Sequence, residues 1–296
     1  MSALAPSRGA ADPIRGRSLW DDAWRKLRRN RAATLGACVI AAMAVLVIAG
    51  PWVARFAYDF ADFSNVMSAP SFATGHWFGT DTLGRDMFVR TLYGGRISML
   101  VGIAATAVSL AIGVAYGAIA GYSGGRVDAL MMRVIDILYA LPFMFFAILL
   151  MVLLGRHLVL IFVAIGAINW LDMARIVRGQ TLTLKHREFV EAAEAQGVSS
   201  AAIIRRHIVP NLLGIVVVYV TLTIPQVILV ESFLSFLGLG VQEPMTSWGA
   251  LVQEGSTVVE PAPWILSFPA LFLAATLFCF NFVGDGLRDA LDPKDR

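Results

Sequence analysis

Long apolar runs with few or no charges constrain the fold of this chain more than any other feature. We place them at residues 32–54, 97–121, 129–154, 157–177, 212–237 and 263–284. A helix needs about 20 mainly apolar residues to cross roughly 30 Å of hydrocarbon, and each run is long enough. Only 15% of the residues are charged, against about 25% in soluble domains. The sequence therefore predicts an all-α membrane protein with six transmembrane helices, of which the fourth and fifth, interrupted by Asp172, Pro225 and Glu231, are the least regular.

The distribution of Lys and Arg predicts the orientation of these spans. If the N-terminus lies in the cytoplasm, 19 of the 24 basic residues flank the spans on that side. The other side keeps only Arg55, Arg85, Arg90, Arg96 and Arg156. Cytoplasmic flanks of membrane proteins carry such an excess of positive charge. We therefore expect six spans with both termini in the cytoplasm.

The N-terminal residues 1–31 are polar and basic and contain no apolar stretch, so we expect no cleavable signal peptide. Within them, 18–31 has the pattern of a helix whose apolar face includes Trp20 and Trp24 and whose other face is basic. A helix of this kind lies in the headgroup layer of a membrane. An ordinary basic anchor for the first span explains the same residues, and both interpretations stay open.

Residues 55–96 form the predicted extracytoplasmic loop. Asp86 is expected to cap a short amphipathic helix, Met87–Tyr93, that leads into the second span. His76 has no spaced His or Cys partner, so we interpret it as a surface histidine rather than a metal ligand. Inside the second span, Gly113, Gly117 and Gly121 repeat every four residues, which predicts close packing against another helix.

The segment 188–210, between the fourth and fifth spans, is too regular for a simple turn. Glu188–Gln196 contains mostly helix-forming residues, and Gly197 follows where a left-handed residue would stop the helix. Ser199 and Ser200 are expected to cap a second helix, and Pro210 to end or bend the chain as it re-enters the membrane. Small residues at Ala192 and Ala193, flanked by Glu191 and Glu194, would let a partner approach the first helix. The alternative is a solvated helical connector.

These residues resemble the EAA loop of ABC-importer permeases. The matching motifs are Glu191-Ala192-Ala193, then Gly197, and the ending His207-Ile208-Val209-Pro210-Asn211. The resemblance implies that this segment is a coupling helix seated in a cleft of an ATPase. On it, the ATPase-coupling residues are Glu191, Ala192, Ala193, Gly197, Ile208 and Pro210. Ile208 sits one place later than in the broad consensus and Val209 replaces a leucine, and both departures are typical of the peptide-importing branch.

Further motifs along residues 16–296 are similar to the peptide and nickel permease branch, and the tail is close to the C-type subunits of bacterial oligopeptide permeases. The motifs are Phe78-Gly79-Thr80-Asp81, Gly84-Arg85-Asp86, the stretch 231–240, Ser247-Trp248-Gly249 and the tail 279–293. The resemblance implies a type I importer permease fold in a bacterial inner membrane. It also implies a heterodimer with a homologous permease subunit, two ATPase subunits, an extracytoplasmic peptide-binding protein and a peptide substrate. The expected divisions are 1–31, 32–54, 55–96, a five-helix core over 97–284 and a cytoplasmic tail over 285–296.

The chain carries no nucleotide site of its own, because no Gly-x-x-x-x-Gly-Lys-Ser/Thr string occurs in it. We therefore expect a non-catalytic subunit without cofactor or metal, whose partner ATPases bind ATP and Mg²⁺. We expect contact with the lipid bilayer and none with nucleic acid.

Ionisable groups inside the spans are costly and usually face a partner, the bundle interior or a water-filled path. Asp136 lies three residues after Arg133, so we expect the two to pair, and Asp172 and Arg175 to do the same. Glu231 has no basic residue within helical reach and lies near Gln226. Lining of a translocation path and local structural fixing both explain Glu231. The candidate path-lining residues are Glu231, Gln226 and Asp136.

Other functions remain to be distinguished. Dipeptides, nickel complexes and peptide antibiotics are alternative substrates within the same branch. A secondary transporter driven by an ion gradient would show internal repeats and midplane ion sites, and the sequence shows neither convincingly. An intramembrane enzyme would need a paired nucleophile and base, which His157 and Asp136 do not supply.

Overall fold

The structure is a computed structural model that describes residues 19–142, 145, 148–149, 152–153 and 158–291. Its regular elements are all helices. They are α1 (Leu19–Arg29), α2 (Arg31–Val53), α3 (Met87–Ser123), α4 (Gly125–Ala140), α6 (Leu158–Leu184), α7 (Glu188–Ala195), α8 (Ser200–Ile203), a π-helical turn η1 (Ile204–Ile208), α9 (Val209–Phe236), α10 (Trp248–Ser256) and α11 (Pro263–Leu291).

Four helices in the described part of the chain are long and apolar enough to cross a membrane. They are Arg31–Val53, Met87–Ser123, the continuous Ser200–Phe236 and Pro263–Leu291. The predicted spans 129–154 and 157–177 correspond to α4, α6 and a stretch that lies partly outside the described residues. The count of six spans therefore stays a prediction.

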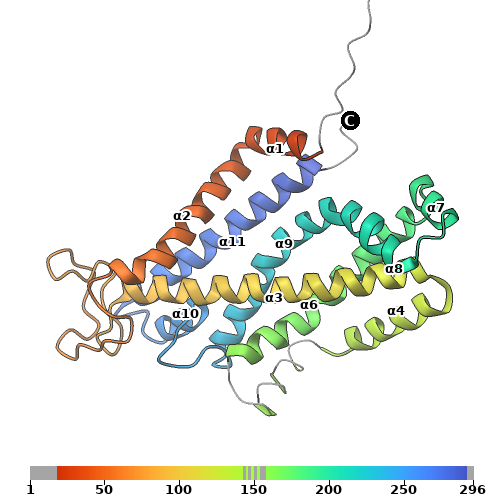
Figure 1. The fold of residues 1–296 in the computed structure, drawn as a ribbon. Helices are drawn as coiled ribbons and strands as arrows, with labels where there is room; N and C mark the ends of the chain where they lie inside the picture. The colour runs from red at the N-terminus through yellow and green to blue at the C-terminus, as the bar shows by residue number, and fades with distance from the viewer. Residues whose placement is uncertain (1–18, 143–144, 146–147, 150–151, 154–157, 292–296) are drawn as a thin grey trace, which may run out of the picture.

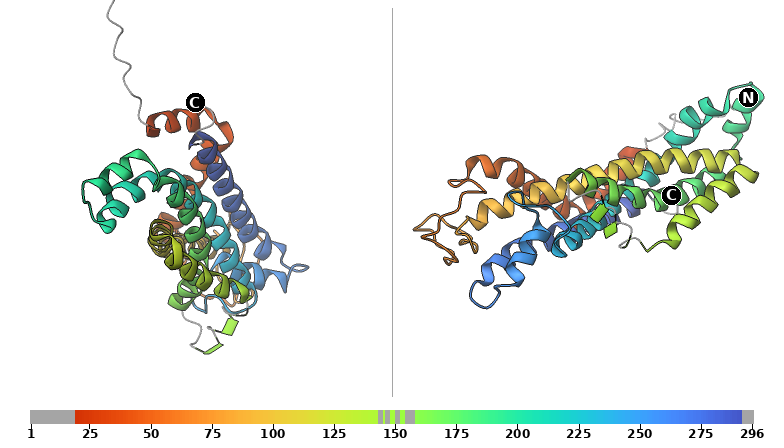
Figure 2. Two further views of the ribbon diagram at one scale, coloured as in Figure 1. Left: turned by 90° about the vertical axis from the view of Figure 1, so that its right-hand side faces the viewer. Right: turned by 90° about the horizontal axis from the view of Figure 1, so that it is seen from below.

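The helices run along one elongated bundle (Figure 1). The loop after α2 and helix α10 lie at one end. The segment α7–α8 projects at the other end, and α1 and the end of α11 lie together on that side of the bundle (Figures 1 and 2). The bundle thus separates a loop-rich end from an end that carries the projecting helical segment.

Helix α3 is the central element, and it packs against α2, α6 and α9. Its three spaced glycines face α6. The sequence predicted a close helix neighbour for them without identifying which helix it is. A Cβ atom added to Gly113 would come within 2.5 Å of the Met173 side chain, and one added to Gly121 within 2.8 Å of the Arg178 carbonyl oxygen. At Gly117 the added atom would overlap the backbone of α6. The close packing expected of these glycines is confirmed.

Helix α3 also begins earlier than the predicted second span. Asp86 caps it by accepting a hydrogen bond from the Val89 N–H at 2.9 Å, as expected. However, Met87–Tyr93 is not a separate helix, because it continues without a break into the span. The intervening Gly94 and Gly95 lie directly against α10 and so serve packing rather than a break.

Helices α1 and α2 meet at Asn30, whose side chain accepts a hydrogen bond from the Ala33 N–H at 3.2 Å and so caps α2. The predicted helix start at Ser18 lies outside the described residues. In α1, Ala23 is buried while Trp24 is exposed, with the Arg28 guanidinium 4.6 Å from the centre of its ring. An exposed indole beside basic side chains suits a headgroup layer, and interfacial placement stays a prediction.

Candidate functional site

The predicted helix, turn and second helix are present in α7, Gly197 and α8. Gly197 adopts a φ of 76°, the left-handed conformation expected of a helix-stopping glycine. Its N–H donates to the Glu194 carbonyl at 2.9 Å, and the Val198 N–H donates to the Ala193 carbonyl at 3.1 Å. This pair of bonds is the Schellman arrangement, which satisfies the last carbonyls of a helix. The turn is therefore defined by backbone hydrogen bonds and does not depend on a partner.

One face of α7 is buried within this chain. Val190 and Ala193 are 0% and 5% exposed, and they pack in a cluster with Ile203, Ile208 and Val177. The expectation that both alanines admit a partner is therefore wrong for Ala193, because its methyl group fills the chain's own core. The same cluster joins α7 to α6 and to the start of α9, so α7 is fastened to two long helices.

The other face of α7 is exposed. Glu191 and Ala192 lie on it, and the Glu191 carboxylate has no hydrogen-bond or ion-pair partner among the described residues. Glu194 differs, because its Oε1 accepts a hydrogen bond from the Tyr122 hydroxyl of α3 at 2.7 Å. Gly197 is also exposed and completes this outward surface.

The return from α8 into α9 has a form that the sequence reasoning missed. The chain stays helical from Ser200 to Phe236 through the π-helical turn η1, in which the Val209 N–H bonds the Ile204 carbonyl. Pro210 lies in the first turn of α9, directly after this π-helical turn, so it does not end the helical chain there. A bend at Pro210 stays a prediction. Ile208 is fully buried and Pro210 is exposed. Ser199 occupies the N-cap position of α8, but its side chain accepts no capping hydrogen bond.

Glu231 is fully buried where α3, α9 and α10 meet. Its carboxylate accepts hydrogen bonds from the hydroxyls of Ser98 at 2.9 Å and Ser235 at 2.6 Å. The Ser98 oxygen in turn accepts from the backbone N–H of Trp248 in α10 at 3.2 Å, and the Ser247 hydroxyl donates to the Ser235 hydroxyl at 3.2 Å. The geometry favours the structural-fixing interpretation of Glu231, because this carboxylate faces hydroxyls of its own chain rather than open space. Path lining by Glu231 stays a prediction.

The acidic side chains Asp136 of α4 and Asp172 of α6 have other ion-pair and hydrogen-bond partners than the sequence predicted. Asp136 pairs with Arg175 of α6 at 2.8 Å rather than with Arg133 of its own helix. Asp172 accepts a hydrogen bond from the Tyr139 hydroxyl, and the ion pair of Arg175 among the described residues is with Asp136 rather than with Asp172. Besides its ion pair with Asp136, the Arg175 guanidinium lies 4.1 Å from the centre of the Tyr139 ring.

These α4 and α6 side chains share one property that sequence spacing did not reveal. Asp136, Tyr139, Asp172 and Arg175 are all exposed on the surface of this single chain. Gln226 of α9 is exposed too, without a hydrogen-bond partner among the described residues. Polar groups on the outside of apolar helices are costly in lipid, so they indicate a face that meets water or another subunit.

The loop-rich end holds an ionic cluster that sequence reasoning also missed. Buried Asp81 lies 2.6 Å from Nε of Arg85 and 3.2 Å from Nε of Arg90. Glu254 of α10 lies 3.1 Å from Nη2 of Arg90, and exposed Glu243 lies 2.9 Å from Nη1 of Arg85. The hydrogen bond from Arg85 lowers the pKa of Glu243 below its usual value. The i,i+4 spacing of Asp81 and Arg85 was the available signal for this cluster.

The interpretation of His76 as a surface residue is wrong. His76 is 4% exposed, its Nδ1 lies 2.8 Å from an oxygen of Asp86, and its ring stacks on Phe56 at 4.3 Å. The histidine therefore helps hold the loop against the start of α3. Within the described residues, no group of three or more His, Cys, Asp or Glu side chains is placed to hold a metal ion.

Comparisons with known proteins agree on one family. Residues 113–296 match the family described as binding-protein-dependent transport system inner membrane component. Residues 18–70 match the N-terminal transmembrane domain of oligopeptide transport permease C.

Full-length relatives are similar over almost the whole chain. The chain is 58% identical to the oligopeptide transport system permease protein OppC of Escherichia coli strain K12, over 96% of this chain and 94% of that protein. It is 46% identical to the protein of the same name from Bacillus subtilis, over 99% of this chain and 96% of the relative. The dipeptide transport system permease protein DppC of B. subtilis is also 46% identical, over 97% of this chain and 90% of the relative. The chain belongs to the family of binding-protein-dependent transport system inner-membrane components.

Proposed function

We propose that this chain is one permease subunit of an ATP-driven, binding-protein-dependent importer of oligopeptides. The observation that carries the proposal is the 58% identity to an oligopeptide permease over nearly the full length of both chains. The subunit pairs with a homologous permease, and the two enclose the translocation path in a bacterial inner membrane. Two partner ATPases bind ATP and Mg²⁺, and a binding protein delivers the peptide from outside. This chain contributes no catalytic residue.

The proposed topology has six spans, with both termini and α7 in the cytoplasm. Four apolar helices, together with α4 and α6, supply enough helical segments. The excess of Lys and Arg on one side supports the orientation. The placement of α1, α7 and the end of α11 on one side of the bundle agrees with it (Figure 1).

In this proposal α7 is the coupling helix. Its exposed Glu191, Ala192 and Gly197 meet the ATPase, while buried Val190 and Ala193 fasten it to α6 and α9. A displacement of α7 is then passed to α9, because close-packed side chains transmit strain. Ile208 acts inside that buried cluster, and exposed Pro210 lies at the start of the helix that moves.

The proposed translocation path runs along the face that carries Asp136, Tyr139, Asp172 and Arg175, with Gln226 of α9 as a further candidate. A water-filled path shared with the partner permease would solvate these exposed polar groups. Glu231 contributes by anchoring α10 at the loop-rich end.

Two substitutions on α7 test the coupling assignment. Ala192→Trp places a bulky side chain on the exposed face, and Glu191→Ala removes its unpaired carboxylate. We expect both to reduce co-purification of the ATPases and ATP-driven uptake of a labelled oligopeptide in proteoliposomes. Glu188→Ala, an exposed acid on the same helix, is the matched control. Normal co-purification and uptake in both test variants would refute the assignment.

The substrate is tested in the same proteoliposomes by competition. Because a dipeptide permease is 46% identical to this chain, a dipeptide that displaces the labelled oligopeptide completely at equal concentration would favour the dipeptide alternative. Uptake that survives ATP depletion and collapses with the ion gradient would favour a secondary transporter.

A further inference from the structure

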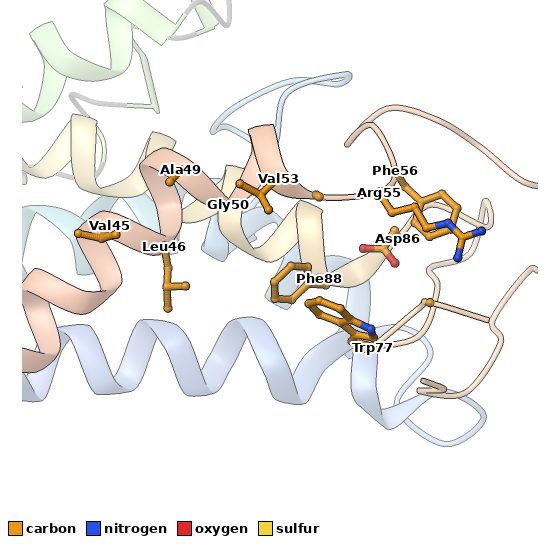
Figure 3. Close-up of a pocket in the computed structure, with 12 residues that line it drawn as sticks. Val45, Leu46, Ala49, Gly50, Val53, Arg55, Phe56, Trp77, Asp86 and Phe88 are labelled. Carbon is orange, nitrogen blue, oxygen red and sulfur yellow. The ribbon is translucent and has the colours of Figure 1, made fainter. Parts of the chain in front are cut away.

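A groove opens at the loop-rich end of α2, where the helix meets the start of α3 and the following loop. Its cavity volume is about 320 Å³. One wall is apolar and consists of Val45, Leu46, Ala49 and Val53 along α2, as Figure 3 shows. These side chains point away from the protein core, and Val45 and Val53 are 64% and 84% exposed. Because α2 is an apolar candidate span, this wall lies at membrane depth.

The far end of the groove is polar and aromatic. Trp77 and Phe88 form its floor, with ring centroids 4.8 Å apart, and Arg55 lies at its rim (Figure 3). Arg55 lies two residues after the end of α2. If α2 spans the membrane, this position is where the chain passes from the hydrocarbon into the headgroup layer. Exposed Trp52 and half-exposed Trp77 mark the same boundary, since indoles concentrate at membrane interfaces.

The charges at this rim leave one cation without a counter-ion. The guanidinium of exposed Arg55 lies 5.6 Å from the centre of the Phe56 ring, and it has no ion-pair partner in the described part of the chain. Asp86 also lines the groove, but one of its oxygens accepts the Val89 N–H and the other lies 2.8 Å from His76. The indole N–H of Trp77 likewise has no hydrogen-bond partner among the residues described. Both residues line the groove, so two donors at this end, one of them charged, have no acceptor within the described part of the chain.

We propose that this groove binds an anionic phospholipid, with an acyl chain along α2 and the headgroup phosphate at Arg55 and Trp77. The apolar wall from Val45 to Val53 is about 12 Å long at 1.5 Å per helical residue. One leaflet of hydrocarbon is about 15 Å thick, so an acyl chain matches this wall. The phosphate supplies the acceptor that both donors lack, and a guanidinium is well suited to bind it. The proposal requires that α2 spans the membrane and that the partner permease leaves this groove open to lipid, and it is independent of the transported substrate.

The test compares lipid retention by native mass spectrometry of the full-length chain with its co-purifying subunits. The complex is released from nanodiscs that contain equal amounts of phosphatidylglycerol and phosphatidylcholine. A basic side chain near a membrane surface changes anionic-lipid binding by about five-fold. We therefore expect Arg55→Ala to lower the preference for phosphatidylglycerol about five-fold. Arg126→Ala removes an exposed arginine at the other end of the bundle and should leave the preference unchanged.

Two further measurements test the contribution of the apolar wall to lipid binding separately from that of Arg55 at the rim. Ala49→Phe fills the exposed apolar wall without touching the core, and it should lower retention of both lipids. A photoreactive amino acid at Leu46, in an otherwise unchanged chain, should yield an adduct with the mass of a phospholipid. The proposal is overturned if Arg55→Ala keeps the full preference, if Ala49→Phe retains both lipids normally, or if the Leu46 adduct is a polypeptide.

Discussion

Replacing Glu231 tests whether its serine cluster holds the loop-rich end of the bundle together. Glu231→Ala removes the acceptor for two close hydroxyl donors, Ser98 and Ser235, at 2.9 and 2.6 Å. Each lost hydrogen bond costs about 1 kcal/mol. Truncating a fully buried side chain to Ala leaves a cavity that costs about 2 kcal/mol or more. Relief of the buried carboxylate's desolvation offsets part of this, so we expect a net loss of about 3 kcal/mol.

Glu231→Gln is the informative companion. The amide is almost the same size and still offers one acceptor oxygen, while the serine hydroxyls can rotate to accept from its NH₂ group. We expect a loss of less than about 1.5 kcal/mol. Ser232→Ala is the matched control, because its hydroxyl lies 3.5 Å from the carboxylate and contributes little.

The assay is reversible unfolding of the purified chain in detergent, with peptide uptake measured in parallel. A double-mutant cycle between Glu231→Ala and Ser98→Ala should show coupling of at least about 0.5 kcal/mol, as expected for contacting residues. Unchanged stability in Glu231→Ala would refute the anchoring role. If Glu231→Gln keeps wild-type stability but loses uptake, the carboxylate acts in transport rather than in the fold.

Three further predictions concern packing, the turn after α7 and the outer loop. Gly117→Leu should separate α3 from α6 and abolish recovery of folded protein in size-exclusion chromatography, whereas Gly179→Ala, which meets nothing within 4 Å, should be neutral. Gly197→Val should cost about 1–2 kcal/mol at its left-handed φ and lower uptake, while the asparagine variant at this position should be tolerated better. Because Arg85 lowers the pKa of Glu243, the tie between them is present above the usual glutamate pKa and is lost as pH falls through the lowered value. Proteolysis near residues 237–247 should therefore rise in acid, and a Glu243→Gln variant that keeps the full pH dependence would contradict this.

Local signals in the sequence were sufficient to predict features that depend only on residues close along the chain, such as helix caps and helix ends. Asp86 caps α3 because its carboxylate reaches an N–H three residues ahead. Gly197 stops α7 because it accepts a left-handed backbone that other residues resist. The spacing of Gly113, Gly117 and Gly121 likewise predicted a close helix neighbour without identifying it.

Pairing between helices was not predictable in the same way. Arg133 lies within helical reach of Asp136, but Arg175 from α6 takes the carboxylate because the packing of α4 and α6 brings it to 2.8 Å. His76 was interpreted as exposed because it has no spaced His or Cys partner, and its actual partners, Phe56 and Asp86, are brought to it only by the fold of the loop.

The sequence by itself determined the membrane class, the four long apolar helices and the position of the turn after α7, because apolar length and glycine conformation are local properties. Only the tertiary structure decided which side of α7 faces outward. Ala192 and Ala193 are adjacent and identical, yet one is exposed and the other lies in the core with Val190. The physical reason is that successive residues of a helix point about 100° apart, and the side that is buried depends on where α6 and α9 lie.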